Sequence, residues 1–315
     1  MLKIAVVGTG LIGKNHLYAI AESEECILCA VCDVNQELVA TLAEQFDVPY
    51  FTDYREIVSK TDAEAVILNL PHWLHCEMTE YFLRNGLHVL VEKPMANTIE
   101  ECDRMIAAEK ESGKKLAIGH IQRFFMANRK VKEIYESGEL GKLCMFHEIR
   151  TVDYFLPNRP KWFWKKELAG GGIVMNYGAH VLDKLFYILD ETPIETSSST
   201  GNSKNDKDIE GHAQFFLKFP SEVSANITFS GYGAPCYESV YHFTEGTVKV
   251  VNSSEVWINR NGGWEKLAVE GDNKPLKRQL ESFCEYIKGE PSEIVTSQYA
   301  RDIIQVIEKV YGKED

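Results

Sequence analysis

The chain has 315 residues, 44% of them hydrophobic, which is enough to bury a large core and favours two domains over one. Its 34 Lys and Arg are outnumbered by 47 Asp and Glu, and the net charge of -13 argues against nucleic acid or an anionic membrane as a partner. No apolar run approaches the roughly 20 residues that a membrane-spanning helix needs, and the N-terminus begins directly with a strand pattern. We therefore expect a cytoplasmic protein.

The first motif is a glycine-rich turn between a strand and a helix. Residues 3–7 have the pattern of a short buried strand, and a helical pattern follows. Between them lies G-x-G-x-x-G, in the strand-turn-helix context that a dinucleotide-binding turn requires. Glycine there permits a tight turn, the approach of a pyrophosphate to the backbone and close helix packing, while the helix start offers N–H groups to phosphate. The expected cofactor contacts are Gly8, Gly10, Leu11, Ile12 and Gly13.

An acidic residue follows the second predicted strand. Residues 27–32 are apolar and end at Asp33, 20 residues after Gly13. A carboxylate at this point accepts hydrogen bonds from an adenosine ribose and repels a 2′-phosphate. The sequence therefore favours NAD over NADP.

Three cysteines near the same strand have a spacing that is also found among iron–sulfur ligands, since Cys26, Cys29 and Cys32 spell C-x-x-C-x-x-C. Residues three apart on a strand face opposite sides, so Cys29 should point away from the other two. We predict buried thiols and no cluster.

Two histidines follow the next buried strand. Residues 65–70 read as a strand that ends at Leu70 and Pro71, and His72 and His75 then open a helix. Two histidines three apart can share a metal ion, but no third ligand is spaced nearby. We expect one of them to line a pocket at the strand end, and we predict no metal site.

The stretch HVLVEKP, residues 88–94, combines a buried strand with a charged ending. Its aliphatic residues do not alternate with polar ones, which is typical of a parallel strand covered on both faces. Glu92 and Lys93 then fall at the carboxyl end of the strand, where open α/β sheets bind ligands. The alternative is a strand that simply ends in charged residues as it reaches solvent.

Two domains of different character are predicted, giving an α/β fold. In residues 1–121 six strands alternate with helices, which predicts a right-handed, doubly wound parallel sheet. Residues 122–315 contain strand runs in which apolar and polar residues alternate, as in a large, mostly antiparallel open sheet. Segment 196–208 reads as a loop, and the last helix, about 297–312, is expected to pack back on the first domain. The strand runs are 143–152, 212–219, 222–230, 237–251, 255–259 and 264–269.

A polar stripe lies on a helix that should be buried. Residues 173–189 are apolar nearly all round, yet Asn176, His180 and Asp183 share one side at spacings of four and three. Buried polar groups need hydrogen-bond partners. The stripe is either an internal network or the wall of a ligand cavity, and the pattern favours neither.

In this order and spacing, the motifs resemble those of the Gfo/Idh/MocA family, named for glucose–fructose oxidoreductase, inositol dehydrogenase and a rhizopine catabolism protein. The resemblance implies an N-terminal Rossmann domain and a C-terminal α/β domain whose open sheet often forms an oligomer interface, here in a homodimer or homotetramer. It also implies NAD- or NADP-dependent redox chemistry at a hydroxyl of a sugar, sugar nucleotide or cyclic polyol. The motifs are GTGLIG at 8–13, Asp33, Pro71 with His75, EKP at 92–94, GHIQRF at 119–124 and GGGIVMNYGAHVLD at 170–183.

The resemblance also implies roles for individual residues. His180 matches the base that accepts the hydroxyl proton, and Lys93 matches the residue that hydrogen-bonds the reacting oxygen. A nearby ammonium group should lower the pKa of His180 and keep its imidazole free to accept a proton. Asn176 stands where many members have aspartate, so it should position substrate and cannot act as a base. The bond before Pro94 is expected to be cis.

The remaining expected contacts are divided between cofactor and substrate. Tryptophan at 162 or 164 would stack on a sugar ring or cover the nicotinamide, although packing within a loop explains Trp164 equally well. The expected cofactor contacts outside the turn are Asp33, Leu70, Pro71, His75, Glu92 and Lys93, and the expected substrate contacts are Lys93, Arg123, Tyr154, Trp162, Asn176 and His180.

We therefore predict an NAD-dependent dehydrogenase that acts on a sugar, glycoside, sugar nucleotide or cyclitol hydroxyl. Two alternatives stay open. In the first, NAD is retained and regenerated in each cycle of glycoside cleavage or epimerisation, without net redox change. In the second, the protein is a non-catalytic sensor of NAD or a sugar, a reading that the presence of Lys93 and His180 disfavours.

Overall fold

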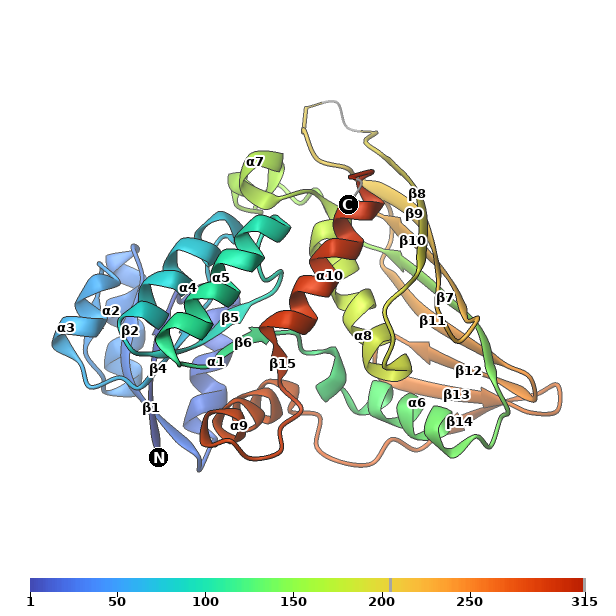
Figure 1. Ribbon diagram of the computed structural model, residues 1–315, viewed down its shortest axis with the longest axis horizontal. Helices are drawn as coiled ribbons and strands as arrows, with labels where there is room; N and C mark the ends of the chain where they lie inside the picture. The colour runs from blue at the N-terminus through green and yellow to red at the C-terminus, as the bar shows by residue number, and fades with distance from the viewer. Residues whose placement is uncertain (204–205, 314–315) are drawn as a thin grey trace. The chain divides into compact units, whose positions relative to one another are not determined.

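The computed structural model describes residues 1–203 and 206–313, which form two compact units. Unit 1 contains Met1–Ile121 and Lys274–Arg301, and unit 2 contains Gln122–Asn273 together with the described residues from Asp302 onward. Helix α10 (Ser297–Val310, labelled in Figure 1) contributes its residues up to Arg301 to unit 1 and its later residues to unit 2.

Unit 1 is built on a sheet with the strand order β15-β6-β5-β4-β1-β2-β3. Its central strands are almost completely buried, because their β-branched and aliphatic side chains are covered on both faces. All the strand pairs are parallel apart from β15 with β6. The strands are β1 (Leu2–Val7), β2 (Cys26–Cys32), β3 (Tyr50–Phe51), β4 (Ala65–Leu68), β5 (His88–Glu92), β6 (Leu116–Gly119) and β15 (Val295–Thr296).

Helices α1 to α5 of unit 1 connect these strands, and α9 precedes β15. The connections run from β1 toward β2 in one direction and from β4 toward β5 in the other. Since such crossovers are right-handed, helices of the two halves cover opposite faces of the sheet. The predicted doubly wound sheet is confirmed. The helices are α1 (Leu11–Ala21), α2 (Gln36–Phe46), α3 (Arg55–Lys60), α4 (His75–Arg84), α5 (Ile99–Ser112) and α9 (Pro275–Lys288).

Unit 2 contains a sheet with the order β14-β13-β12-β11-β7-β10-β9-β8, in which the β7–β10 pair is parallel and the other pairs are antiparallel. The predicted large, mostly antiparallel sheet is thus confirmed. The strands are β7 (Leu143–Thr151), β8 (Glu195–Gly201), β9 (His212–Lys218), β10 (Ser224–Ser230), β11 (Cys236–Phe243), β12 (Gly246–Val251), β13 (Glu255–Asn259) and β14 (Trp264–Leu267).

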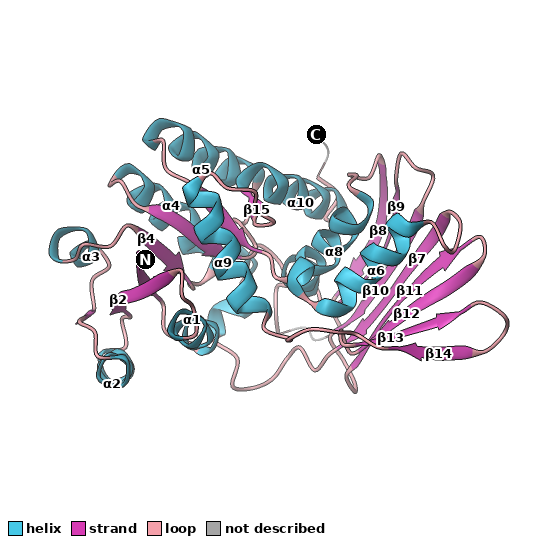
Figure 2. Ribbon diagram, turned by 90° about the horizontal axis from the view of Figure 1, so that it is seen from below, coloured by secondary structure: helices cyan, strands magenta, loops and turns pink. Residues whose placement is uncertain are grey.

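The two faces of this sheet differ. Helices α6 (Met126–Ser137) and α8 (Ala179–Leu189) lie along one face, and in the described part of the chain no helix of unit 2 covers the other (Figure 2). Alternate residues of β7 follow this division, since Phe146 is buried while Met145 and Ile149 are 44% and 39% exposed. We call the uncovered side, which carries Met145 and Ile149, the open face.

Three details differ from the sequence prediction. The prediction of a loop over 196–208 is wrong for its first part, because β8 (Glu195–Gly201) is a strand. The Ser and Thr residues of β8 suit an exposed edge strand. Residues 204–205 lie outside the described residues. The run 237–251 is two strands, β11 and β12, joined at Thr244 and Glu245. The buried helix begins with a π-helical turn, Val174–Gly178, before it continues as α8.

A buried ionic network joins α8 to the sheet. The Lys184 ammonium donates hydrogen bonds of 2.7 Å to Glu148 Oε2 and to the Ser239 hydroxyl, and Arg150 Nη2 lies 3.2 Å from Glu148 Oε1. Burial by itself would raise the pKa of Glu148, but the charges of Lys184 and Arg150 lower it overall. One carboxylate therefore compensates two buried cations.

We predict that Glu148→Ala strongly destabilises the protein, by about 3 to 5 kcal/mol, because it leaves the two buried cations without their anion. Urea denaturation followed by tryptophan fluorescence should show a lower midpoint. The control is Glu136→Ala, which removes the exposed partner of Lys132 and should hardly move the midpoint. Equal midpoints for the two variants would contradict the prediction.

Candidate active site

The carboxyl edge of the unit 1 sheet gathers the predicted cofactor residues. Strands β1, β4 and β5 are neighbours, and the chain turns in opposite directions on either side of the boundary between β1 and β4. Open α/β sheets bind ligands outside such a boundary. Gly8 follows β1, Leu70 and Pro71 lie just beyond β4, and Lys93 follows β5.

The glycines of the turn have different surroundings. Gly8 has a φ of +86°, and a Cβ there would lie 2.1 Å from the backbone oxygen of Asn69. A Cβ at Gly13 would lie 1.9 Å from the Gly8 oxygen, whereas one at Gly10 would meet no atom within 4 Å. Gly8 and Gly13 are thus needed for close packing, and Gly10 leaves open space. Helix α1 begins beside it without a side-chain cap, so its first N–H groups suit a phosphate.

Asp33 is held beside this turn. Its Oδ2 accepts hydrogen bonds from the Thr9 N–H at 2.7 Å and the Thr9 hydroxyl at 3.1 Å, and its Oδ1 accepts from the Asn35 N–H at 2.9 Å. A carboxylate has capacity for further donors. The open space at Gly10, the uncapped helix start and this fixed acid together fit the pyrophosphate and ribose of a dinucleotide.

His75 lies behind this edge. The side chain is completely buried, with Nδ1 2.8 Å from the Pro94 carbonyl oxygen and Nε2 2.9 Å from the Leu70 carbonyl oxygen. Burial lowers the pKa of His75. The ring therefore connects the segment after β4 to the segment after β5, and its nitrogens face protein backbone.

Glu92 lies between β5 and the first helix. Its Oε1 is 3.1 Å from Nε2 of the buried His16, and a Cβ at Gly119 would lie 3.0 Å from its carboxyl carbon. Burial alone would raise the pKa of Glu92, but the hydrogen bond with His16 and the positive charge of Lys93 lower it overall. The carboxylate thus stays charged next to Lys93. The Lys93–Pro94 peptide bond is cis, as expected.

In unit 2, the predicted stripe spans the π-helical turn and α8. Asn176 lies within the turn, and His180 and Asp183 lie on α8. Arg123 Nη2 donates a 2.9 Å hydrogen bond to Asp183 Oδ1, and Asp183 is fully buried. Arg123 therefore forms a buried ion pair with the helix, one turn beyond His180.

Tyr154 contacts the π-helical turn at the start of this helix. Tyr154 is 1% exposed and shares a side-chain hydrogen bond with Asn176; burial raises its pKa. Its ring also lies against Trp164, which stacks on Phe155 at 5.5 Å. Trp162 stacks instead on Phe163, its neighbour in the chain. Tyr154 and Asn176 are thus directly joined, and Arg159 lies over the rings of both Tyr154 and Phe163.

Three residues near these sites had not been singled out from the sequence. They are His16, Glu210 and Tyr311, which hydrogen-bond Glu92, the Gly172–Val174 backbone and Glu210, respectively. His16 follows the glycine turn by three residues, so its position on the inner side of α1 could have marked it. The partners of Glu210 and Tyr311 are distant in the sequence and leave no local pattern.

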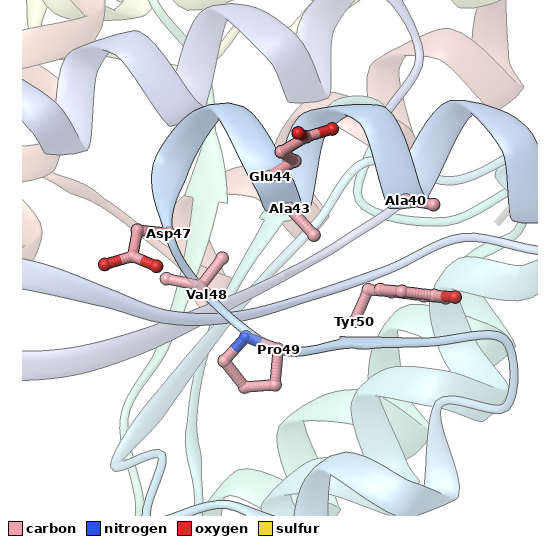
Figure 3. A pocket seen from close by; sticks show the side chains of 7 residues that line it. All are labelled: Ala40, Ala43, Glu44, Asp47, Val48, Pro49 and Tyr50. Carbon is pink, nitrogen blue, oxygen red and sulfur yellow. The ribbon is translucent and has the colours of Figure 1, made fainter.

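A surface hollow of about 460 Å³ lies elsewhere in unit 1 (Figure 3). Its lining comes from the end of α2 and the start of β3, which is the amino end of a parallel strand. Ligands of open α/β sheets bind at the opposite edge. We assign this hollow no role. Its lining residues are Ala40, Ala43, Glu44, Asp47, Val48, Pro49 and Tyr50.

The described residues contain neither a metal-binding cluster nor a membrane-spanning helix. Across 1–203 and 206–313, no three His, Cys, Asp or Glu side chains are arranged to hold a metal ion. Cys26 and Cys32 are buried, Cys29 is partly exposed, and all three are free thiols. In the same part of the chain, no helix has the length and apolar character needed to cross a bilayer.

Both halves of the chain match models of one protein family. Residues 2–120 match the oxidoreductase family GFO/IDH/MocA, NAD-binding Rossmann fold, and residues 128–249 match the GFO/IDH/MocA C-terminal domain. The two matched segments coincide with the main parts of unit 1 and unit 2.

Individual relatives agree with this assignment. The chain is 30% identical over 264 residues to 1-carboxy-3-chloro-3,4-dihydroxycyclohexa-1,5-diene dehydrogenase of Comamonas testosteroni, a match to 83% of this chain and 62% of that protein. It thus spans less than two thirds of that relative. It is 25% identical to D-glucoside 3-dehydrogenase of Escherichia coli, over 98% and 94% of the two chains. The crystal structure of aldose-aldose oxidoreductase from Caulobacter crescentus with glycerol superposes with a TM-score of 0.90 at 27% identity, covering 99% and 96%.

We predict that Gly10→Ala and Gly13→Ala have different consequences. Gly10→Ala places a methyl group in open space, so the melting temperature should stay within a few degrees while dinucleotide affinity falls about tenfold or more. Gly13→Ala clashes with the Gly8 backbone, so both properties should fall. Scanning calorimetry and titration calorimetry with NAD measure the two quantities. Unchanged NAD affinity in Gly10→Ala would show that the cofactor does not approach this turn.

Proposed function

Since the chain belongs to the Gfo/Idh/MocA oxidoreductase family, we propose that it is an NAD-dependent enzyme acting on a secondary hydroxyl, or the corresponding ketone, of a sugar, glycoside, sugar nucleotide or cyclic polyol. The observation that carries the proposal is the setting of Lys93. It follows β5 at the carboxyl edge of the sheet, next to a carboxylate and near the strand boundary that bears the glycine turn. A lysine in this setting suits chemistry beside a dinucleotide.

The proposed reaction divides into a hydride and a proton. When bound, NAD supplies the acceptor for the hydride that leaves the alcohol carbon. In the direction of oxidation, the imidazole of His180 takes the hydroxyl proton, and Nζ of Lys93 donates a hydrogen bond to the oxygen as the carbonyl forms. The negative charge of the Glu92 carboxylate attracts the ammonium group of Lys93.

Substrate positioning is proposed for Asn176 and Tyr154. Their hydrogen bond fixes the amide, which then offers its remaining donor and acceptor capacity to sugar hydroxyls. Arg123 stays a proposed substrate contact, and its ion pair with Asp183 also orients α8. The aromatic rings around Phe155, which include Trp164, offer flat apolar surface of the kind that packs against sugar rings.

A purified sample screened with NAD against sugars, sugar nucleotides, glycosides and inositols tests the substrate class, with NADH absorbance as the signal. On the best substrate, we predict that Lys93→Ala and His180→Ala each lower kcat about 100-fold or more, while the Kd of NAD changes little. Lys110→Ala, which removes an exposed lysine of α5, is the control and should keep wild-type turnover. Near-normal turnover in the Lys93 or His180 variant would refute the proposed roles.

We propose NAD as the preferred cofactor over NADP, because Asp33 would repel a 2′-phosphate. Asp33→Asn removes the charge and keeps one acceptor oxygen. We predict that it lowers the ratio of the Kd for NADP to the Kd for NAD about tenfold or more. The control is Asp53→Asn, which removes an exposed carboxylate near β3 and should leave the ratio unchanged. Titration calorimetry with both cofactors measures the ratio, and an unaltered ratio in Asp33→Asn would remove the basis for the preference.

A second candidate function is a reaction that regenerates NAD in every cycle. The name of the Caulobacter relative describes an oxidoreductase with aldoses on both sides of the reaction, and such a balance needs no external oxidant. An enzyme of this type would retain NAD through gel filtration and would turn over without added cofactor. A purely NAD- or sugar-sensing protein would show no turnover in either assay.

We also propose a homo-oligomer, a homodimer or homotetramer, that associates through the open face of the unit 2 sheet. This face exposes Met145, Ile149 and Phe216, and exposed apolar side chains on a sheet face that no described helix of unit 2 covers suit a protein partner. Sedimentation velocity measures the oligomeric state.

We also propose a cytoplasmic location, since all eight cysteines are free thiols, as is usual in a reducing compartment.

A further inference from the structure

The glycine run before the π-helical turn is packed against two residues from distant parts of unit 2. A Cβ at Gly171 would lie 2.0 Å from the Tyr311 hydroxyl oxygen, and one at Gly172 would lie 2.1 Å from the Glu210 backbone oxygen. Any side chain at either position would therefore displace Tyr311 or the Glu210 segment. The absence of side chains at these positions lets Glu210 and Tyr311 reach the backbone.

These two side chains bind three backbone N–H groups at the start of the helix. Glu210 accepts hydrogen bonds of 2.8 Å from the Gly172 N–H and from the Val174 N–H, one on each carboxyl oxygen. The Tyr311 hydroxyl accepts from the Met175 N–H at 3.1 Å and donates to Glu210 Oε1 at 2.8 Å. The Gly172 and Val174 N–H groups and the Tyr311 hydroxyl all donate to the carboxyl oxygens, which favours the carboxylate form, whereas burial raises the pKa of Glu210.

The position of these contacts along the helix is specific. N–H groups in the first turn of a helix have no carbonyl partner within the helix, so an acidic group from elsewhere both satisfies them and interacts favourably with the helix dipole. The segment they hold is the π-helical turn Val174–Gly178, which contains Asn176 and directly precedes His180. π-helical turns are rare and are frequent at functional sites.

We propose that Glu210 and Tyr311 are positioning residues, which fix the π-helical turn and thereby the side chains of Asn176 and His180. Their effect on catalysis rests on the proposed function, whereas their hold on the turn does not. If they only stabilised the fold, their removal would lower the melting temperature without changing turnover in the folded enzyme.

The first measurement is hydrogen exchange of the full chain, followed by mass spectrometry on peptides that cover residues 170–180. Tyr311→Phe removes the acceptor of the Met175 N–H, and Glu210→Gln removes the charge and one of the two acceptor oxygens. Both variants should exchange about tenfold faster than wild type in this segment. Tyr241→Phe is the matched control, because it removes another buried tyrosine hydroxyl of unit 2, on β11, and should exchange as wild type.

The second measurement is steady-state kinetics on the substrate found by screening. Both variants should lower kcat about tenfold or more, while the Kd of NAD, which depends on residues of unit 1, stays within about twofold. Tyr241→Phe should keep wild-type kcat. If Glu210→Gln does not fold, the exchange rate and kcat of Tyr311→Phe test the positioning role, since this substitution removes only one oxygen atom.

The outcomes separate this inference from the proposed function. Wild-type exchange in Tyr311→Phe would overturn the positioning role whether or not a substrate is found. Faster exchange with wild-type kcat would overturn it too, because a turn that does not need to be fixed is not positioned for catalysis. Failure of Lys93→Ala and His180→Ala to reduce turnover would instead overturn the proposed function and leave the exchange result standing.

Discussion

Close backbone contact in the turn after β1 is the constraint on which the carboxyl edge of unit 1 depends. A Cβ at Gly13 or at Gly8 would lie about 2 Å from a backbone oxygen, so three segments can meet there only if these residues lack side chains. The end of β1, the start of α1 and the chain after β4 then share one small space. The same packing brings the Thr9 N–H to Asp33, which forms a rigid surface of N–H groups and one carboxylate.

Unit 2 uses the same device for a different purpose. At Gly171 and Gly172 the missing side chains admit Tyr311 and Glu210, whose polar atoms then bind the first turn of a helix. In unit 1 the space beside a helix start is open, and we propose that a dinucleotide occupies it. In unit 2 the corresponding space is filled by the protein, and the helix carries Asn176 and His180 a few residues farther on. Glycine before a helix therefore leaves open space in unit 1 and admits polar groups of the protein in unit 2.

The sequence was most informative where the deciding contacts are local. The strand, turn and helix around Gly10 and the strand before Lys93 could be predicted, because buried parallel strands have an uninterrupted apolar pattern. The edge strand β8 could not, since its Ser and Thr residues have the composition of a loop and only pairing with β9 makes them a strand. Pairing of this kind is a property of the whole sheet.

Much of the candidate site could be named from the sequence, but its internal contacts could not. The hydrogen bond between Tyr311 and Glu210 joins residues 101 positions apart, and the Arg123–Asp183 pair joins residues 60 apart. Neither spacing follows a helical or strand period. His75 illustrates the same limit, because the sequence places it at a strand end, while only the fold shows that its nitrogens face the carbonyl oxygens of Leu70 and Pro94.

Helix α10 gives the molecule a property that neither unit has by itself. Its first residues belong to unit 1, where Ser297 hydrogen-bonds Glu109, and its later residues belong to unit 2, where the Val310 carbonyl accepts from Ser198. A helix forms cooperatively along its length, so loss of packing at one end weakens the other. The packing of α10 therefore contributes to the stability of both units.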